Sequence, residues 1–123
     1  MFEVTIEQTF AAGHALRNYR GKCENVHGHN YRCQVTVEGR DLDQIGLLVD
    51  FVALKKTLQT VIDRLDHQWL NDFKPFDELN PSAENIAKYI YEEVSKDLDT
   101  NGSVKLACVR LWETDTSSAT YRA

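Results

Sequence analysis

The sequence predicts an α+β domain in which two amphipathic helices cover one face of a four-stranded antiparallel sheet, in the order β-β-α-α-β-β. Two observations carry this prediction. Apolar and polar residues alternate over most of the first forty positions, as in half-buried strands, and two later stretches repeat apolar residues every three or four positions, as in helices. The 123 residues contain no linker or repeat, so we expect a single domain over 1–123.

The first two strands bring histidines into the inward-facing rows. Residues 2–12 alternate, and continuing their even positions puts His14 in the apolar row. Residues 27–38 alternate as well, with His27 and His29 in the row that is otherwise apolar. Antiparallel pairing of these two strands would place His14 near the other two histidines at one end of the sheet, unless a bulge shifts the parity.

Two helices follow, each with a predicted cap. Asp50 is a candidate N-cap for a helix that ends near Leu65, and Ser82 for a second helix that ends at Asn101-Gly102. The segment between them contains Pro75 and Pro81 and is predicted as a loop. Two more strands are predicted over residues 103–113 and 119–122.

The strand over residues 103–113 is apolar at both even and odd positions. A sheet with helices on one face should leave its other face in water, so an apolar second face predicts a cover. The simplest cover is another copy of the chain.

Composition excludes several classes of protein. The hydrophobic and charged fractions, 42% and 27%, are ordinary for a globular protein, and no apolar run approaches the roughly 20 residues of a membrane span. The net charge of -5 argues against nonspecific nucleic-acid binding. The N-terminus lacks the features of a signal peptide, so we expect a cytoplasmic protein with free thiols. Cys33 and Cys108 are expected in the core.

The remaining polar residues predict a metal site with chemistry around it. Three histidines can bind zinc and leave its fourth position open, as catalytic zinc requires. Cys23 lies beside Lys22, and a nearby positive charge favours a reactive thiolate, although an inert loop cysteine fits as well.

Two further motifs contain carboxylates. Asp66-His67 can orient a proton-transferring imidazole, or the histidine can simply complement the dipole at the helix end; the second interpretation is slightly favoured. Glu113 is either a carboxylate at a pocket rim or a solvated strand end.

Together these motifs resemble the 6-pyruvoyl-tetrahydropterin synthase family, over essentially the whole chain. The bacterial branch that forms 6-carboxy-tetrahydropterin in the queuosine pathway is the most similar. The resemblance rests on motifs that fall in the family's order: Cys23 three residues before His27-Gly28-His29-Asn30-Tyr31, Gly46-Leu47-Leu48-Val49-Asp50-Phe51, Leu65-Asp66-His67-Gln68-Trp69-Leu70-Asn71, Pro81-Ser82-Ala83-Glu84-Asn85 and Glu113-Thr114.

The resemblance implies a tunnelling fold, in which three sheets join as a barrel and two trimers stack into a homohexamer. It also implies 7,8-dihydroneopterin triphosphate as the substrate and Zn²⁺ as the cofactor. The implied roles are zinc binding by His14, His27 and His29; general base for Cys23; proton relay for Asp66 and His67, from a neighbouring subunit; and pterin anchor for Glu113. The cations Arg17, Arg20 and Lys22 are candidates for the triphosphate, although no motif fixes them.

Several alternatives remain open at this point. Within the family they are the pyruvoyl-forming synthase and an aldolase-like or epimerase relative. Outside it, the chain could be a noncatalytic zinc-binding or pterin-binding module, although a binder needs no general base. The short gap between Cys23 and the histidine pair favours the carboxy-forming branch.

Overall fold

The computed structural model describes residues 1–18, 27–98 and 102–123, with His27 described through its backbone only. Two long strands, β1 (Phe2–His14) and β2 (His27–Gly39), pair antiparallel without a break, with Phe2 opposite Gly39 and His14 opposite His27. The predicted alternation therefore holds along both strands. It extends two residues further in β1 than residues 2–12, as far as His14.

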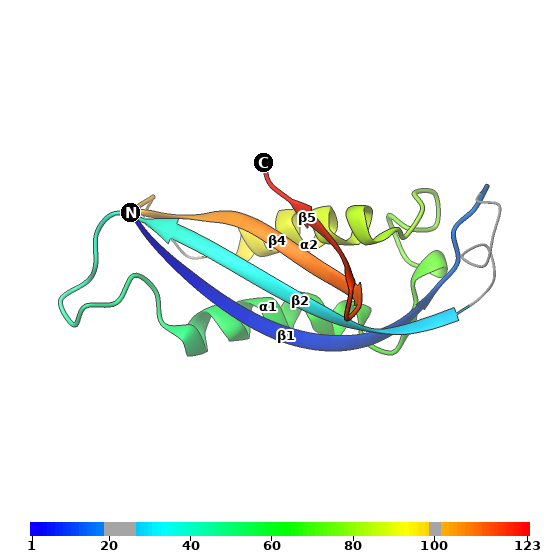
Figure 1. Cartoon of the computed structure of the whole chain (residues 1–123), viewed down its shortest axis with the longest axis horizontal. Coiled ribbons are helices and arrows are strands. Elements are labelled where there is room, and N and C mark those ends of the chain that lie inside the picture. The colour runs from blue at the N-terminus through cyan, green and yellow to red at the C-terminus, as the bar shows by residue number, and fades with distance from the viewer. Residues whose placement is uncertain (19–26, 99–101) are drawn as a thin grey trace.

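Both predicted helices are present with their predicted caps. Helix α1 (Phe51–Leu65) begins where the Asp50 carboxylate accepts a hydrogen bond from the backbone of Val52. Helix α2 (Ala83–Asp97) begins where the Ser82 hydroxyl accepts one from the backbone of Asn85. Such side-chain caps satisfy donors that the first turn leaves without partners. Figure 1 shows both helices on the same side of the sheet.

The sheet has five strands, which corrects the four-stranded antiparallel prediction. Strand β4 (Val104–Thr114) pairs antiparallel with β2, and β5 (Ser117–Tyr121) with β4. The fifth strand, β3 (Gln68–Trp69), runs parallel to β1, so the sheet is mixed and its order is β3-β1-β2-β4-β5. A two-residue strand has no periodicity to read, and the sequence predicts the whole segment between the two helices as a loop. A short 3₁₀ helix, η2 (Leu70–Asp72), follows β3.

A bulge explains why β4 looked apolar on both faces. Thr36 lies opposite Cys108 but Val37 lies opposite Leu106, so Ala107 is an extra residue in β4. The bulge changes the parity, and the large apolar residues on either side of it turn to the same, helix-covered face. The opposite face carries polar side chains, among them Glu3, Thr5, Gln34, Thr36 and Arg110, which line a shallow groove there. The apolar second face predicted from the sequence is therefore wrong.

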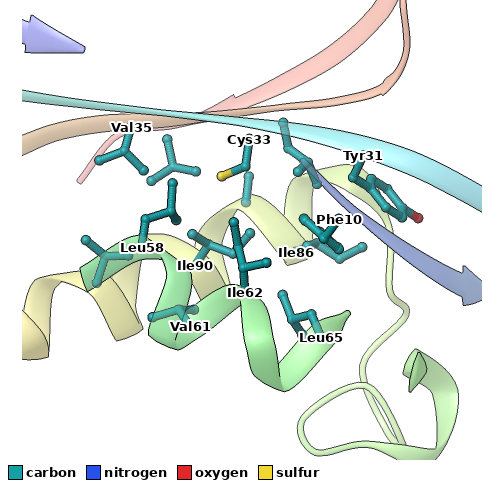
Figure 2. Close-up of a cluster of buried hydrophobic side chains, with 14 of the residues drawn as sticks. Phe10, Tyr31, Cys33, Val35, Leu58, Val61, Ile62, Leu65, Ile86 and Ile90 are labelled. Carbon is teal, nitrogen blue, oxygen red and sulfur yellow. The ribbon is translucent and has the colours of Figure 1, made fainter. Parts of the chain in front are cut away.

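The core lies between the sheet and the two helices. Figure 2 shows side chains from β1 and β2 packed against α1 and α2. Cys33 and Cys108 are both buried free thiols, as predicted, but Cys33 lies in this core while Cys108 lines the groove on the opposite face. Burial raises the pKa of Cys33 to about 12. No helix in the described residues has both the length and the apolar character to cross a bilayer.

Candidate functional site

Three side chains with metal-binding atoms meet where the central strands extend past the core. They are His14 at the end of β1, His29 in β2 and Glu113 in β4, and their ligand atoms all lie within 4.8 Å of one another. The carboxylate Oε1 of Glu113 is 2.9 Å from Nε2 of His14 and 3.4 Å from Nε2 of His29. The two imidazole rings meet edge to face, with centroids 5.1 Å apart.

The sheet geometry explains this convergence. His14 and His29 belong to the inward-facing rows of two paired strands, and Ala12 lies directly opposite His29. Glu113 lies at a second irregularity of β4, where the register against β5 shifts between Trp112 and Thr114. Bulges often redirect a side chain near a functional site. The backbone of His27 lies opposite that of His14, while its side chain lies outside the described residues.

His14 is held in a mostly buried position, with 1% of its surface exposed. Its Nδ1 lies 2.7 Å from the carbonyl oxygen of Pro81, at the start of α2. Burial lowers the pKa of His14, but the hydrogen bonds to Glu113 and Pro81 outweigh it, so the pKa is raised overall. The polar contacts of this imidazole together therefore shift its pKa more than burial does.

The donor set fits zinc. Imidazole nitrogens and a carboxylate oxygen are among the ligands that zinc takes in proteins, and three protein ligands leave a position for substrate. His14, His29 and Glu113 offer one such atom each, close enough together to share an ion. The predicted third histidine, His27, adds a further candidate whose side chain lies outside the described residues.

Asp66 and His67 form a contact pair at the end of α1. Oδ2 of Asp66 lies 3.0 Å from Nδ1 of His67, and Oδ1 accepts a hydrogen bond of 2.9 Å from the backbone of Ala11. The bond from Ala11, followed by the interaction with His67, holds the pKa of Asp66 below its usual value. His67 has a φ of 59°, a left-handed conformation that costs energy outside glycine and occurs often at functional sites.

One hollow borders both His67 and His29, on the sheet face of Gly13 and Gly28, which alternation places opposite the face that carries the side chains of His14 and His29. A cavity of about 520 Å³ is lined by both His29 and His67, together with Trp69. Its floor includes Gly13 and Gly28, which lie directly opposite each other in the β1–β2 pair. Two facing glycines remove the side chains that would otherwise fill the space. The side chain of His67 is 82% exposed, and its role, in proton transfer or at the dipole of the helix end, stays a prediction.

A second hollow of about 400 Å³ lies on the other side of Glu113. Its wall is formed by small side chains of β5, including Ser118 and Ala119, and by Ala83 and Glu84 at the start of α2. Its volume falls in the range of small-molecule sites. Glu113 therefore borders a space for a ligand as well as the two histidines.

The cationic and thiol candidates are only partly placed. Arg20, Lys22 and Cys23 lie outside the described residues. The guanidinium of Arg17 is tied to the protein, since its Nη2 donates to the carbonyl oxygens of Phe76 and Asn71 at 2.8 and 3.4 Å.

Sequence reasoning assigned no role to three groups around His14. One is the carbonyl of Pro81, which contacts the ring of His14. The other two are the side chains of Asn71 and Asn80, which bind the backbone just after His14. A backbone carbonyl has no signature in a sequence. Both asparagines stand in segments that were predicted as loop, where asparagine is common and gives no hint of a distant partner.

Known proteins resemble this chain along almost its full length. A 6-carboxy-5,6,7,8-tetrahydropterin synthase of Bacillus subtilis is 38% identical over 128 residues, covering 98% of this chain and 85% of the relative. A dihydroneopterin monophosphate aldolase of Pyrococcus furiosus is 41% identical over 105 residues, covering 85% and 83%. The structure of Caenorhabditis elegans 6-pyruvoyl tetrahydropterin synthase superposes with a TM-score of 0.85 at 31% identity, covering 100% and 97%.

The family model described as 6-pyruvoyl tetrahydropterin synthase matches residues 3–123. That range includes every strand and helix from β1 to β5 except the first residue of β1, and all three members of the histidine–glutamate cluster. The chain belongs to the 6-pyruvoyl tetrahydropterin synthase family.

Proposed function

We propose that this protein is a zinc-dependent 6-carboxy-tetrahydropterin synthase of queuosine biosynthesis. It would convert 7,8-dihydroneopterin triphosphate and water to 6-carboxy-5,6,7,8-tetrahydropterin, acetaldehyde and triphosphate. The observation that carries this proposal is the cluster of His14, His29 and Glu113 beside a hollow that Glu113 lines, on a chain 38% identical to a 6-carboxy-tetrahydropterin synthase.

His14, His27 and His29 are proposed to hold the zinc. When bound, zinc polarises the oxygens of the substrate side chain and so acidifies the adjacent carbon-bound protons. The buried imidazole of His14, fixed by Pro81, supports this assignment because a rigid ligand loses little entropy on binding. Glu113 is proposed to anchor the pterin, whose ring N–H and amino groups suit a carboxylate with two acceptor oxygens. The hollow between Glu113 and β5 supports that role.

The proton transfers are assigned to three side chains. Cys23, as thiolate, is proposed to take a proton from the substrate side chain, and the Asp66–His67 pair to pass protons to and from it. The 3.0 Å contact between the Asp66 carboxylate and the His67 imidazole supports this pair as the relay. The relay is proposed to come from a neighbouring subunit, across an interface of the proposed homohexamer. Arg17, Arg20 and Lys22 remain the proposed contacts for the triphosphate.

Assembly into a homohexamer, as a dimer of trimers, is also proposed. Within the described residues, β5 and the Phe2–Ala11 part of β1 each have a strand on one side only. Open strand edges of this kind can pair with another copy and close a barrel. The single-domain organisation over 1–123 fits one protomer of such a barrel. Sedimentation should show a hexamer or trimer, and a monomer at micromolar concentration would contradict the barrel.

Product analysis tests the proposed reaction. The zinc-loaded protein, incubated with 7,8-dihydroneopterin triphosphate, should release acetaldehyde and triphosphate in equal amounts and leave a pterin with one carboxylate carbon. Triphosphate release without acetaldehyde, and a pterin that keeps its three-carbon side chain, would instead indicate pyruvoyl formation.

An aldolase is the second candidate, because the Pyrococcus furiosus dihydroneopterin monophosphate aldolase is 41% identical to this chain. Aldol cleavage of the monophosphate would leave a hydroxymethyl pterin and a phosphorylated two-carbon aldehyde. Parallel incubations with the monophosphate and the triphosphate separate the two activities, since only the aldolase should accept the monophosphate and yield the phosphorylated aldehyde.

A further inference from the structure

The side chains of Asn71 and Asn80 form a clamp, a set of hydrogen bonds to the backbone immediately after His14. Oδ1 of Asn71 accepts a hydrogen bond from the backbone N–H of Ala15, and its Nδ2 donates to the carbonyl of the same residue, both at 2.9 Å. Asn80 makes the same pair of 2.9 Å bonds with the backbone of Arg17. Each side-chain amide thus bonds to both the N–H and the C=O of one residue, as a residue of a neighbouring strand would. The two residues bound, Ala15 and Arg17, alternate along the chain beyond the end of β1.

The Asn80 end of this clamp leads directly to the imidazole of His14. The carbonyl of Asn80 accepts a 2.9 Å bond from Nδ2 of Asn85, whose backbone is capped by Ser82. These bonds fix the turn before α2, and the next carbonyl, that of Pro81, lies 2.7 Å from Nδ1 of His14. The clamp therefore holds both the backbone after His14 and the group that contacts its ring.

The contact with Pro81 also selects the tautomer. A carbonyl oxygen can only accept a hydrogen bond, so Nδ1 of His14 must carry the hydrogen. Nε2, which lies 2.9 Å from the carboxylate of Glu113, is then the nitrogen that can give up its hydrogen and offer a lone pair to a metal. A metal-binding histidine is commonly oriented through its other ring nitrogen in this way.

We infer that Asn71 and Asn80 are positioning residues, which hold His14 in the orientation and tautomer that bind the metal. This inference rests on the proposed zinc site. Outer partners of this kind typically change metal affinity by about 10- to 100-fold when they are lost. Neither asparagine contacts the metal-binding cluster through its own side chain in the described contacts; both act through the chain around His14.

Zinc affinity, measured by competition with a chromogenic chelator, tests the inference. Asn80→Ala and Asn71→Ala should each bind zinc about 10- to 100-fold more weakly than the wild type. The control is Ile90→Val, a buried change in the same helix that Ser82 caps, which lowers stability without touching the clamp. It should bind zinc as the wild type does. Using both asparagine variants keeps the test readable if one of them fails to fold.

A double-mutant cycle with His14→Ala, titrated at zinc concentrations high enough to occupy the remaining ligands, isolates the route. If the asparagines act through His14, adding Asn80→Ala to His14→Ala should weaken zinc binding no further. Wild-type affinity in both asparagine variants, or an equal loss in Ile90→Val, would overturn the inference. So would fully additive losses in the cycle. Because zinc binding is measured here and product is not, a failure of the proposed reaction would leave this result interpretable.

Discussion

The core and the candidate site are two parts of the same rows of side chains. Under the helices, the inward-facing rows of β1 and β2 carry Phe10, Cys33 and Val35, and all are buried among apolar neighbours. A few residues further along the same rows stand His14 and His29. The same two strands run through both regions, but the helices face them in the core and a polar segment faces them at the site.

The fold places stability and chemistry in different parts of the sheet. The helices cover the middle of the sheet with apolar side chains, where burial supplies most of the stability. At the end of the strands, the facing groups come from the polar segment between α1 and α2, including Asp66, Asn71 and the Pro81 carbonyl. Substitutions at the strand ends should therefore lower activity and leave stability nearly unchanged. Substitutions under the helices should lower stability and leave the activity of the folded protein nearly unchanged.

The largest expected effect lies on the chemical side. Cys23→Ala should lower turnover about 100- to 10,000-fold, the usual contribution of a general base, while zinc content and substrate binding stay close to those of the wild type. The variant removes the base and leaves the metal-binding side chains intact. Steady-state kinetics and metal analysis measure the two effects. Near-normal turnover would refute Cys23 as the base.

The core should show the reverse pattern. Leu58→Ala removes a fully buried side chain of α1 and should lower the free energy of unfolding by about 2–5 kcal/mol. Because Leu58 lies under the middle of the sheet, the folded fraction should keep its zinc and its specific activity. Denaturant unfolding followed by metal analysis checks this. Loss of zinc from folded Leu58→Ala protein would show that the two regions are not separable.

Glu113 tests the boundary between the regions, since it contacts His14 and also borders the hollow beside β5. Glu113→Ala should weaken pterin binding by about 1–3 kcal/mol, because ring donors of the bound substrate lose their acceptor. Zinc content should stay near the wild-type level if the three histidines hold the metal. Equilibrium binding and metal analysis separate the roles, and a loss of zinc would instead make Glu113 a metal ligand.

The smallest expected effect compares two tyrosines. The hydroxyl of Tyr91 donates to the carbonyl of Leu106 at 3.1 Å, so Tyr91→Phe should cost about 0.5–1.5 kcal/mol of stability. Tyr31 is fully buried beside both histidine rings, and its hydroxyl has no hydrogen-bond partner in the described part of the chain. Figure 2 shows it at one end of the apolar cluster. Tyr31→Phe should therefore leave the free energy of unfolding unchanged or raise it; a loss as large as that of Tyr91→Phe would contradict this.

The sequence was sufficient where one local rule governs many residues. Alternation runs unbroken through β1 and β2, so the convergence of His14 and His29 followed from parity alone. The caps Asp50 and Ser82 followed from residue type and the apolar spacing after them. The predicted α+β class with two helices on one face is confirmed for the same reason.

The rest depends on contacts between distant segments. The extra residue Ala107 in β4 depends on how that strand pairs with β2, and misreading it suggested an apolar second face. Strand β3 is two residues long and forms only because the chain after α1 returns to β1. His67 combines a left-handed backbone conformation with a ring 3.0 Å from Asp66, and no periodic pattern in the sequence predicts that combination.

Metal analysis of the purified protein shows whether the strand ends beyond the core form a zinc site. The native protein should contain about one zinc per chain, and a chelator should abolish turnover. His29→Ala, and equally His27→Ala, should lose both metal and activity while circular dichroism and sedimentation stay unchanged. Native protein that contains no zinc, with turnover that survives chelation, would contradict the account.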